Sequence, residues 1–582
     1  MRQVLSVSKT RFFPTLRQWK QISNVLSKTE QQIIQTALLL IVVSIASLIG
    51  LYLFINQVEI PTQGGEYTEA LIGEPQLINP LYATSNDVDK DLVALIYSGL
   101  MQWKPEEGLV PDLAESININ EEGTVITATI RENARFHNGD PILARDILFT
   151  INAIQNPAYH SPLYGTFKNV TVVQEEDRVV SFTLEKPSAS FLQNLTVGIL
   201  PSGLWADVLP QNAPLAALNL QPVGSGPFQF GEFTKDKKGS IRSYTLKPFK
   251  DWYQPQAFIK RLTFQFYPDQ KSAFDALENK YVKGVSVIPF EEKDQAGQNR
   301  TIVLHSPLID REVVLYFNQK TNEQLKKRGV REAISLAIDK TEIVNNIIQG
   351  QGYVINGPLL SGMPGYKNAE ATQAIDLEKA KTLLKEAKIV SDVIPSEANK
   401  VSEADGSQET KKPNKFTLTV PSGEEFSLVA RYIKSQLETI GLEIEIITIP
   451  SQTFFDEVIS PRNFELLLTT VMFDTTQDPY LFWHSSQIGS AGLNIVEYQN
   501  ADVDKLLESA RSTIKTEERQ NDYKTFEEKI VDDLPAIFLY QSKYNYAVSR
   551  DIQNVKLDSI RVPFDRFANI NEWYIKKKKT FR

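Results

Sequence analysis

The stretch Thr124–Thr150, "TVITATIRENARFHNGDPILARDILFT", contains two local patterns that meet at one turn. Thr124–Phe136 alternates apolar and polar residues, which is typical of a half-buried strand. His137-Asn138-Gly139-Asp140 follows, and Asn-Gly favours a tight turn. A helix is predicted to begin near Ala144. His137 is one of four histidines in the chain, so the stretch could be a catalytic site, a metal site or a piece of scaffold.

Other signs of chemistry are few. The histidines (His137, His160, His305 and His484) stand singly, without the spacing of a metal motif, and there is no cysteine to serve as nucleophile or thiolate ligand. No glycine-rich phosphate loop joins a strand to a helix. In "PVGSGPF" (Pro222–Phe228), Ser225 lies between two glycines and Pro227 follows, which favours a tight turn over a nucleophile elbow. We therefore predict no catalytic residue, no cofactor and no metal.

Length and composition indicate a globular protein of several domains. The chain has 582 residues, of which 42% are hydrophobic and 23% charged, with a net charge of −9. A nucleic-acid-binding protein would usually show a basic domain. We therefore expect no nucleic-acid partner.

Near the N-terminus, Ile33–Ile55 ("IIQTALLLIVVSIASLIGLYLFI") contains no charge, and it exceeds the roughly 20 residues that span a bilayer core. Residues 1–32 carry six basic residues against Glu30, so the positive-inside rule places them in the cytoplasm and the main body outside. The apolar run is too long for a signal peptide and no cleavage pattern follows it closely. We predict an uncleaved single-pass anchor in the cell membrane, with the body extracellular or periplasmic.

The remaining chain mixes strands and helices. Helical periodicity begins at Val330, and Asp339 and Asp376 are predicted to cap two further helices. The order helix, glycine, strand around Gly441 predicts an α/β arrangement for the second half. Residues 390–415 are polar and charged, so we predict a flexible surface insertion there.

Several segments resemble, in order, the peptide-type solute-binding proteins of ABC transporters, the family that includes oligopeptide, dipeptide and nickel binders. The resemblance covers about Gly65 to Trp573. The segments are "GEPQLINPLY", "LIYSGLMQW", "PDLAESININEEGTVITATIRENARFHNGDPILARDILFT", "PVGSGPFQF", "VREAISLAIDKTEIV", "DLEKAKTLLKEA" and "ADVDKLLESA". The resemblance implies that the His137 turn and Ser225 are structural.

The resemblance implies an α/β fold of two lobes that close around a ligand, as in periplasmic binding proteins, with an extra third domain. It predicts crossings between the lobes near 316–318 and 538–540. The implied parts are a cytoplasmic segment (1–32), an anchor (33–55), a base lobe (60–103, 222–316 and 541–582), an extra domain (104–221) and a second lobe (317–540).

The resemblance also implies a ligand site. In peptide-binding members an aspartate after a strand of the second lobe pairs with the peptide's amino group, and Asp474 is the matching residue here. Pro479 lies one position later than the family pattern places it, which leaves Asp478 as an alternative. The preceding strand (Thr470, Val471 and Met472) could pair with the ligand backbone. Trp103, Tyr480 and Trp483 could line the cleft, although core packing is the commoner fate of such residues.

One departure from the family concerns the ligand's carboxylate. Dipeptide binders place an arginine in the segment that corresponds to "PSGEEFS" (Pro421–Ser427), whereas this chain has Glu424 and Glu425. Like charge would repel a carboxylate. A longer peptide or a cationic solute therefore fits better than a dipeptide.

These observations lead to the expectation of a monomeric, membrane-anchored receptor that delivers peptides to the permease subunits of an ABC importer. Two alternatives stay open from sequence: a ligand-sensing receptor of the same fold, and an exported hydrolase that uses Asp474 and Asp478.

Overall fold

The structure is a computed structural model that describes residues 26–55, 57–83, 86–366, 374–390, 414–473, 477–489, 492–513 and 515–581. The predicted insertion at 390–415 lies almost wholly outside these residues, and so does Asp474. The chain divides into two compact units, Met1–Thr62 with Lys576–Arg582, and Gln63–Ile575.

The first unit contains one long helix and a two-stranded ribbon. Helix α2 (Lys28–Ile55) begins with a capping box, in which the Ser27 backbone N–H donates to the Glu30 carboxylate at 2.9 Å. Its stretch Lys28–Tyr52 is long and apolar enough to cross a membrane. Strands β1 (Gln57–Thr62) and β22 (Lys576–Phe581) pair in antiparallel register.

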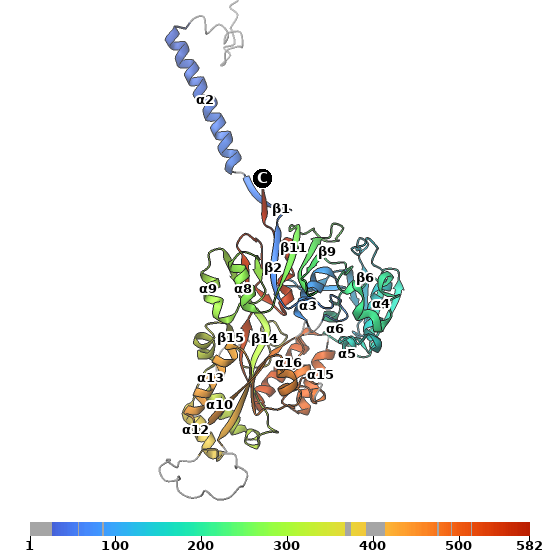
Figure 1. Ribbon diagram of the computed structural model, residues 1–582, viewed down its shortest axis with the longest axis vertical. Helices are drawn as coiled ribbons and strands as arrows, with labels where there is room; N and C mark the ends of the chain where they lie inside the picture. The colour runs from blue at the N-terminus through green and yellow to red at the C-terminus, as the bar shows by residue number, and fades with distance from the viewer. Residues whose placement is uncertain are drawn as a thin grey trace, which may run out of the picture. The chain divides into compact units, whose positions relative to one another are not determined.

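The second unit contains two large sheets (Figure 1). The first sheet has the strand order β13-β20-β12-β2-β11-β10-β9, in which β2 runs parallel to β11 and β12. Its strands are β2 (Glu66–Ile72), β9 (Phe228–Lys235), β10 (Ile241–Pro248), β11 (Arg261–Tyr267), β12 (Gly284–Val285), β13 (Ile302–His305) and β20 (Tyr546–Ser549); the helices of this lobe are α3 (Asp87–Ile96), α8 (Gln270–Glu278) and α9 (Lys293–Gln298).

The second sheet has the order β15-β19-β14-β18-β16-β17, and β21 also pairs with β14. Its strands are β14 (Leu308–Phe317), β15 (Gly352–Val354), β16 (Lys415–Pro421), β17 (Glu443–Ile449), β18 (Leu466–Met472), β19 (Ala536–Lys543) and β21 (Ser559–Ile560). Its helices are α10 (Arg328–Ala337), α11 (Lys340–Glu342), α12 (Leu377–Glu386), α13 (Glu424–Thr439), α14 (Tyr480–Trp483), α15 (Ala501–Ser512) and α16 (Thr516–Asp533).

Helices cover both faces of this second sheet. In β14, Val313 and Leu315 lie in one hydrophobic core with residues of α10, α12 and α13, whereas Val314 and Tyr316 lie in another with residues of α15 and α16. Successive side chains of a strand point to opposite faces, so a strand buried on both faces is apolar almost throughout. The predicted caps are confirmed: Asp339 accepts from Glu342 N at 2.9 Å and Asp376 from Lys379 N at 2.8 Å.

A smaller antiparallel sheet, β5-β6-β8-β7, forms the third part of this unit. It shares one hydrophobic core with the first large sheet. Its elements are β5 (Ala114–Ile119), β6 (Val125–Ile130), β7 (Val170–Glu176), β8 (Val179–Leu184), α4 (Ala144–Gln155), α5 (Tyr164–Phe167), α6 (Phe191–Asn194) and α7 (Ser202–Trp205), and the hairpin β3 (Met101–Lys104) with β4 (Gly108–Pro111) precedes it.

Short 3₁₀ or π turns complete the fold. They are η1 (Pro157–Tyr159), η2 (Pro210–Leu215), η3 (Ala217–Asn219), η4 (Phe290–Glu292), η5 (Glu323–Lys326), η6 (Ile343–Ile347), η7 (Phe455–Ile459), η8 (Ser485–Gln487), η9 (Pro563–Phe567) and η10 (Ile570–Glu572).

The chain passes between the two large sheets at Ser306–Pro307 and at Tyr544–Asn545. The Ser306 hydroxyl donates to the Asn545 side chain at 2.8 Å, which ties the two crossings together. The sequence placed these crossings near 316–318 and 538–540, which are the end of β14 and the interior of β19, both strands of the second sheet. The error has a physical cause, because a hydrophobic run shows that a strand is buried and does not show to which sheet it belongs.

Candidate functional site

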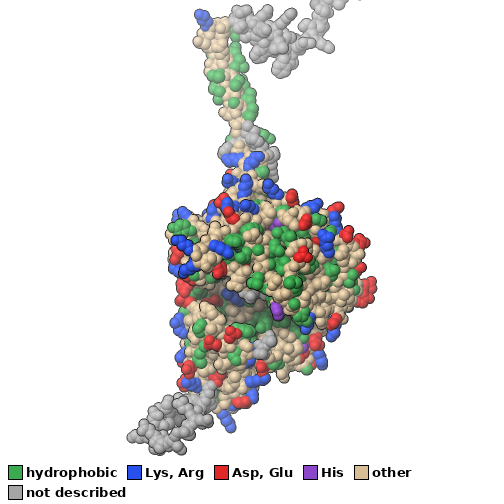
Figure 2. All heavy atoms as spheres, turned by 45° about the vertical axis from the view of Figure 1, so that its right-hand side comes forward, with side chains coloured by type: hydrophobic (Ala, Val, Ile, Leu, Met, Phe, Trp, Pro, Cys, Tyr) green, Lys and Arg blue, Asp and Glu red, His purple; other side chains and the backbone are tan. Residues whose placement is uncertain are grey.

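A cavity of about 580 Å³ lies in the Gln63–Ile575 unit. Residues of the first lobe, of the β3–β4 hairpin and of the third part surround it, and Met472 and Phe473 of the second lobe complete its wall. Figure 2 shows the hollow across the Gln63–Ile575 unit, with hydrophobic side chains along it. The volume and the mainly apolar lining are those of a small-ligand site.

One wall of the cavity is formed by an arginine side chain that stacks on a tryptophan ring. The Arg561 guanidinium carbon lies 4.4 Å from the centre of the Trp103 ring, and Arg561 Nε lies 3.2 Å from Asp565 Oδ2. Both Arg561 and Asp565 are buried. This pairing offsets the cost of removing the two charges from water, and it holds the Trp103 ring in place.

The segment that carries this wall is anchored in the first lobe. Arg566 is fully buried and donates to Glu69 of β2 at 2.8 Å and to Asp91 of α3 at 2.8 Å. Arg566 directly follows Asp565 in η9. The buried ion pairs therefore fix the position of η9 and, with it, of the Arg561 side chain.

Asp310 of β14 organises the neighbouring loop. The Phe473 N–H donates to the Asp310 carbonyl at 3.0 Å, and the Gln477 amide donates to the Asp310 carboxylate. Asp310 is only 4% exposed, and burial raises its pKa to about 6, against the lowering effect of Gln477 and Arg561. Asp310 thus contacts both flanks of the segment that contains Asp474, which itself lies outside the described residues.

Strand β18 presents an open edge beside this loop. Thr470, Val471 and Met472 pair with β14 on one side. On the other side β16 pairs with β18 only at Leu466 and Leu467, so among the described residues no strand pairs with this edge of the last three residues. Met472 is 42% exposed and lines the cavity, whereas Val471 is buried in the core. An extended ligand could add to such an edge through main-chain hydrogen bonds.

The other predicted aromatic residues lie elsewhere. Trp483 is 1% exposed and packs in the core against Tyr316, Tyr498 and Phe538, so it does not line the cavity. The short helix α14 turns its side chain toward the sheet, and core packing therefore replaces the predicted cleft role. Of the three predicted aromatics, the structure brings Trp103 alone to the cavity.

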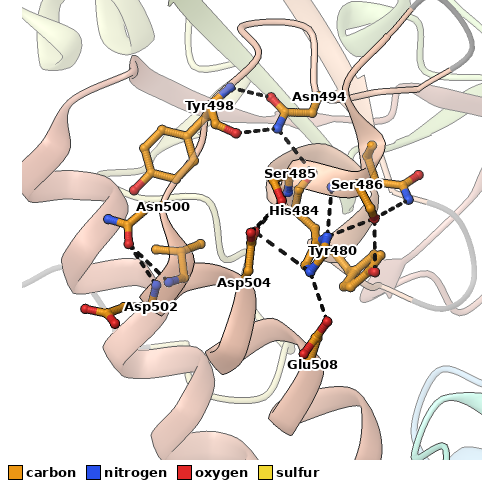
Figure 3. A network of polar contacts seen from close by, with 12 residues as sticks. Tyr480, His484, Ser485, Ser486, Asn494, Tyr498, Asn500, Asp502, Asp504 and Glu508 are labelled. Carbon is orange, nitrogen blue, oxygen red and sulfur yellow. Dashed lines mark hydrogen bonds and ion pairs between the residues drawn. The ribbon is translucent and has the colours of Figure 1, made fainter.

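Tyr480 lies in a stack of three planar groups. The His484 imidazole lies 4.0 Å from its ring centre and the Arg511 guanidinium 3.9 Å. Two planar groups so close to one ring cannot share a face, so they lie on opposite sides of Tyr480. Figure 3 shows the polar contacts around it, including His484 with Asp504 and Glu508 of α15. Tyr480 does not line the cavity.

Asp478, the second acid of the hydrolase hypothesis, has a structural role. It is buried, accepts a hydrogen bond from Tyr480 N at 3.0 Å and lies 2.6 Å from Arg511 Nε. A buried carboxylate that is held by an arginine and a backbone N–H is poorly suited to general acid or base catalysis. Across the described residues, no group of three or more histidine or acidic side chains is placed to hold a metal ion.

Glu424 and Glu425 lie away from the cavity. Glu425 accepts a hydrogen bond from the Tyr540 hydroxyl at 2.7 Å. Glu424 is exposed beside Glu291, which raises the pKa of Glu424. Both Glu291 and Glu424 line a separate groove of about 550 Å³. Glu424 and Glu425 therefore do not line the cavity, where the sequence analysis expected them to repel a ligand carboxylate.

The His137 turn and Ser225 also have structural environments. His137 Nδ1 accepts from Gly224 N at 3.2 Å, and Nε2 lies 3.1 Å from the Gly226 carbonyl. Ser225 is fully buried, and its hydroxyl accepts from Ser98 N at 3.3 Å. Neither residue lines the cavity.

Comparison with known proteins assigns the chain to a family. The model of the bacterial extracellular solute-binding proteins, family 5 (middle region), matches residues 108–491. The chain belongs to family 5 of the bacterial extracellular solute-binding proteins. This solute-binding protein is 27% identical over 534 residues to the oligopeptide-binding protein AppA of Bacillus subtilis. The aligned region covers 89% of this chain and 93% of AppA.

Solved structures agree with this assignment. The B. subtilis AppA structure in complex with a nonapeptide has a TM-score of 0.70 and 26% identity, and covers 89% of this chain and all of that one. The Campylobacter jejuni NikZ structure in complex with Ni(L-His) has a TM-score of 0.70 and 25% identity, and covers 88% of this chain and 99% of that one. AppA is named as an oligopeptide-binding protein, and both structures are complexes with a bound solute.

Sequence reasoning missed Asp310, Arg561 and Asp565. A signal existed for the first, because "LIDREVVLYF" places three charged residues inside an otherwise apolar strand. Charges at such positions are costly unless they are paired. Gln477, which binds Asp310, and Trp103, which lies under Arg561, are more than 150 positions away in the sequence, so these contacts could not be read from it. Asp565, in contrast, is only four residues from Arg561.

Proposed function

We propose that this solute-binding protein is a membrane-anchored receptor that captures peptides and delivers them to the permease subunits of an ABC importer. The single observation that carries the proposal is the cavity wall where β18 ends, because its open strand edge leads directly into the segment that contains Asp474. Main-chain pairing at such an edge binds a peptide regardless of its side chains. The oligopeptide relative of B. subtilis supports this ligand class.

In this proposal the two lobes close around the peptide by bending at Ser306–Pro307 and Tyr544–Asn545. Closure of two domains about a few connecting residues is a recognised type of switch. The energy for closure must come from ligand contacts that exist only in the closed state. Helix α2 holds the receptor in the membrane, and residues 1–32 face the cytoplasm.

The test is calorimetric titration with a peptide that carries either a free or an acetylated amino group. Asp474→Asn should weaken binding of the free peptide by tens- to thousands-fold, because a buried charged hydrogen bond is worth about 2–5 kcal/mol. Acetylation should weaken binding to the native protein similarly. It should have little further effect on the variant, because the two changes remove the same interaction.

Asp456→Asn is the matched control, since it removes the same charge from an exposed position of the same lobe. It should leave both affinities unchanged. Equal losses from acetylation in native and Asp474→Asn proteins would show that Asp474 does not bind the amine. Undiminished binding in all combinations would remove the amino-group hypothesis, and cleavage of the peptide would instead favour the hydrolase.

A further inference from the structure

The C-terminal strand of the protein is strongly basic and returns to the end of helix α2. Strand β22 contains the four consecutive lysines Lys576–Lys579, all of them exposed. Its antiparallel register with β1 places Phe581 opposite Gln57 and Lys576 opposite Thr62. Since β1 begins two residues after the last residue of α2, the ribbon brings the end of the chain back to the end of the candidate membrane span.

Covalent geometry limits how far these lysines can lie from the helix end. Lys579 is paired with Glu59, which is four residues beyond Ile55. An extended chain covers at most about 3.5 Å per residue and paired strands lie about 4.8 Å apart, so the Lys579 backbone lies within about 20 Å of the helix end. This limit holds for any orientation of the ribbon.

One face of the ribbon combines basic and aliphatic side chains. Directly opposite residues of an antiparallel pair share a face, so Val58, Ile60, Lys576 and Lys578 lie on one side. We call these four residues the basic face. Val58 is 39% exposed and Ile60 is 42% exposed. Exposed aliphatic groups beside ammonium groups are typical of surfaces that enter the headgroup region of a bilayer.

Positive charge is in excess on the ribbon. Glu59 is the acidic residue of the two strands, and its carboxylate lies 3.4 Å from Lys577 Nζ. Three more lysines accompany that pair, whereas the whole chain carries a net charge of −9. Figure 2 shows basic side chains gathered just beyond the lower end of the long helix. The positive charge is thus a local property of this ribbon and not of the chain's composition.

We propose that the β1–β22 ribbon binds the anionic phospholipid headgroups of the membrane that α2 spans. The lysine ammonium groups contact lipid phosphates, and Val58 and Ile60 of the basic face enter the interface between headgroups and acyl chains. The interaction holds strand β22 of the receptor at the membrane surface. The proposal rests on the membrane anchoring proposed above.

The experiment uses the full-length chain in lipid nanodiscs of neutral phosphatidylcholine, with increasing fractions of phosphatidylglycerol. The chain has no cysteine, so Thr580→Cys introduces a unique site for a polarity-sensitive fluorophore in β22. The label's emission should shift to shorter wavelength as the phosphatidylglycerol fraction rises. The shift should disappear at 1 M salt, where charges are screened beyond about 3 Å.

Three variants identify the cause of this response. Changing Lys576, Lys577, Lys578 and Lys579 to Gln should weaken the association of the ribbon with phosphatidylglycerol on the order of a hundredfold or more. The reason is that each juxtamembrane lysine strengthens binding to anionic lipid about fivefold. Changing the same four residues to Arg should preserve the response. As a matched control, Lys→Gln at the exposed Lys237, Lys238, Lys247 and Lys250 of the other unit should leave it unchanged.

Failure of this proposal can be told apart from failure of the anchor. A chain that enters the nanodiscs but shows the same emission at every phosphatidylglycerol fraction overturns the lipid proposal alone. A chain that does not co-purify with nanodiscs overturns both. Equal losses in the ribbon and control variants also contradict the proposal, and so does a label that responds only when permease subunits are added.

Discussion

At the residue scale, His137 shows how a histidine in a signature stretch can serve structure alone. Its backbone N–H donates to the Gly224 carbonyl at 2.8 Å, and its two ring nitrogens contact the backbone of Gly224 and Gly226. Burial lowers the pKa of His137 to about 4. The neutral ring can accept at Nδ1 and donate at Nε2, which is what these two contacts require.

This environment predicts a pH dependence of stability. The pKa of His137 is lower in the folded than in the unfolded state. The contribution of the neutral His137 side chain to the free energy of unfolding is therefore fully present above about pH 6.5, and it is lost as the pH falls toward 4. Between pH 7.5 and 5 the loss should be about 2 kcal/mol. His137→Gln should therefore be less stable than the native protein at pH 7.5. At pH 5 the difference in free energy of unfolding between the two proteins should be smaller by about 2 kcal/mol.

Urea unfolding at the two pH values measures this difference. The matched control is His160→Gln, since His160 is exposed and the variant reports the effect of the same substitution away from the buried turn. A constant difference for His137→Gln would contradict the assignment of a buried neutral histidine.

At the element scale, the Gly-Ser-Gly turn depends on close approach to the end of helix α3. A Cβ atom at Gly224 would lie 2.0 Å from the Ile96 carbonyl oxygen, and one at Gly226 would lie 2.6 Å from that of Leu95. The Gly226 N–H donates to the Ile96 carbonyl at 2.8 Å. The glycines are therefore required by packing against backbone, which cannot move aside as a flexible side chain can.

Gly224→Ala should consequently destabilise the protein by about 2–4 kcal/mol, because the added methyl group forces the turn away from helix α3. Gly203→Ala is the control, since no atom lies within 4 Å of a Cβ placed there, and it should change stability little. Thermal unfolding of the two variants provides the measurement. Equal melting temperatures for Gly224→Ala and the native protein would show that α3 and the turn are not held at this distance.

At the scale of the whole molecule, the unit Gln63–Ile575 has its own cores and sheets. A unit that buries its own apolar surface can fold without the rest of the chain. Helix α2, in contrast, exposes apolar side chains along its length. The unit Gln63–Ile575 should therefore be stable in water, whereas helix α2 should require a lipid bilayer.

A fragment of residues 63–575 should be soluble and monomeric and should bind peptide with the affinity of the full chain. The full chain should remain with membranes through high-salt and carbonate washing, because its apolar helix is stable only in a bilayer. Size-exclusion chromatography, calorimetry and membrane fractionation measure these properties. Aggregation of the fragment would contradict an independent fold, and mature protein that begins near residue 60 in cells would contradict an uncleaved anchor.

The sequence by itself determined the local elements and the family. The helices capped by Asp339 and Asp376, and the helix that begins at Ala144, follow the predicted pattern, because caps and apolar periodicity are local properties. The predicted strand Thr124–Phe136 is confirmed only over Val125–Ile130. The apolar run in α2 could also be identified from the sequence alone. The order of short segments along the chain indicated the family, and the match of residues 108–491 confirms it.

Only the tertiary structure decided which elements meet. It placed Leu308–Phe317 in the second sheet, turned Trp483 into the core and set Arg561 over Trp103. It also joined Asp310 to the flanks of the Asp474 segment and paired the C-terminal lysines with β1. Apolar periodicity shows that a residue is buried but not which partner buries it, because that choice depends on contacts between residues hundreds of positions apart.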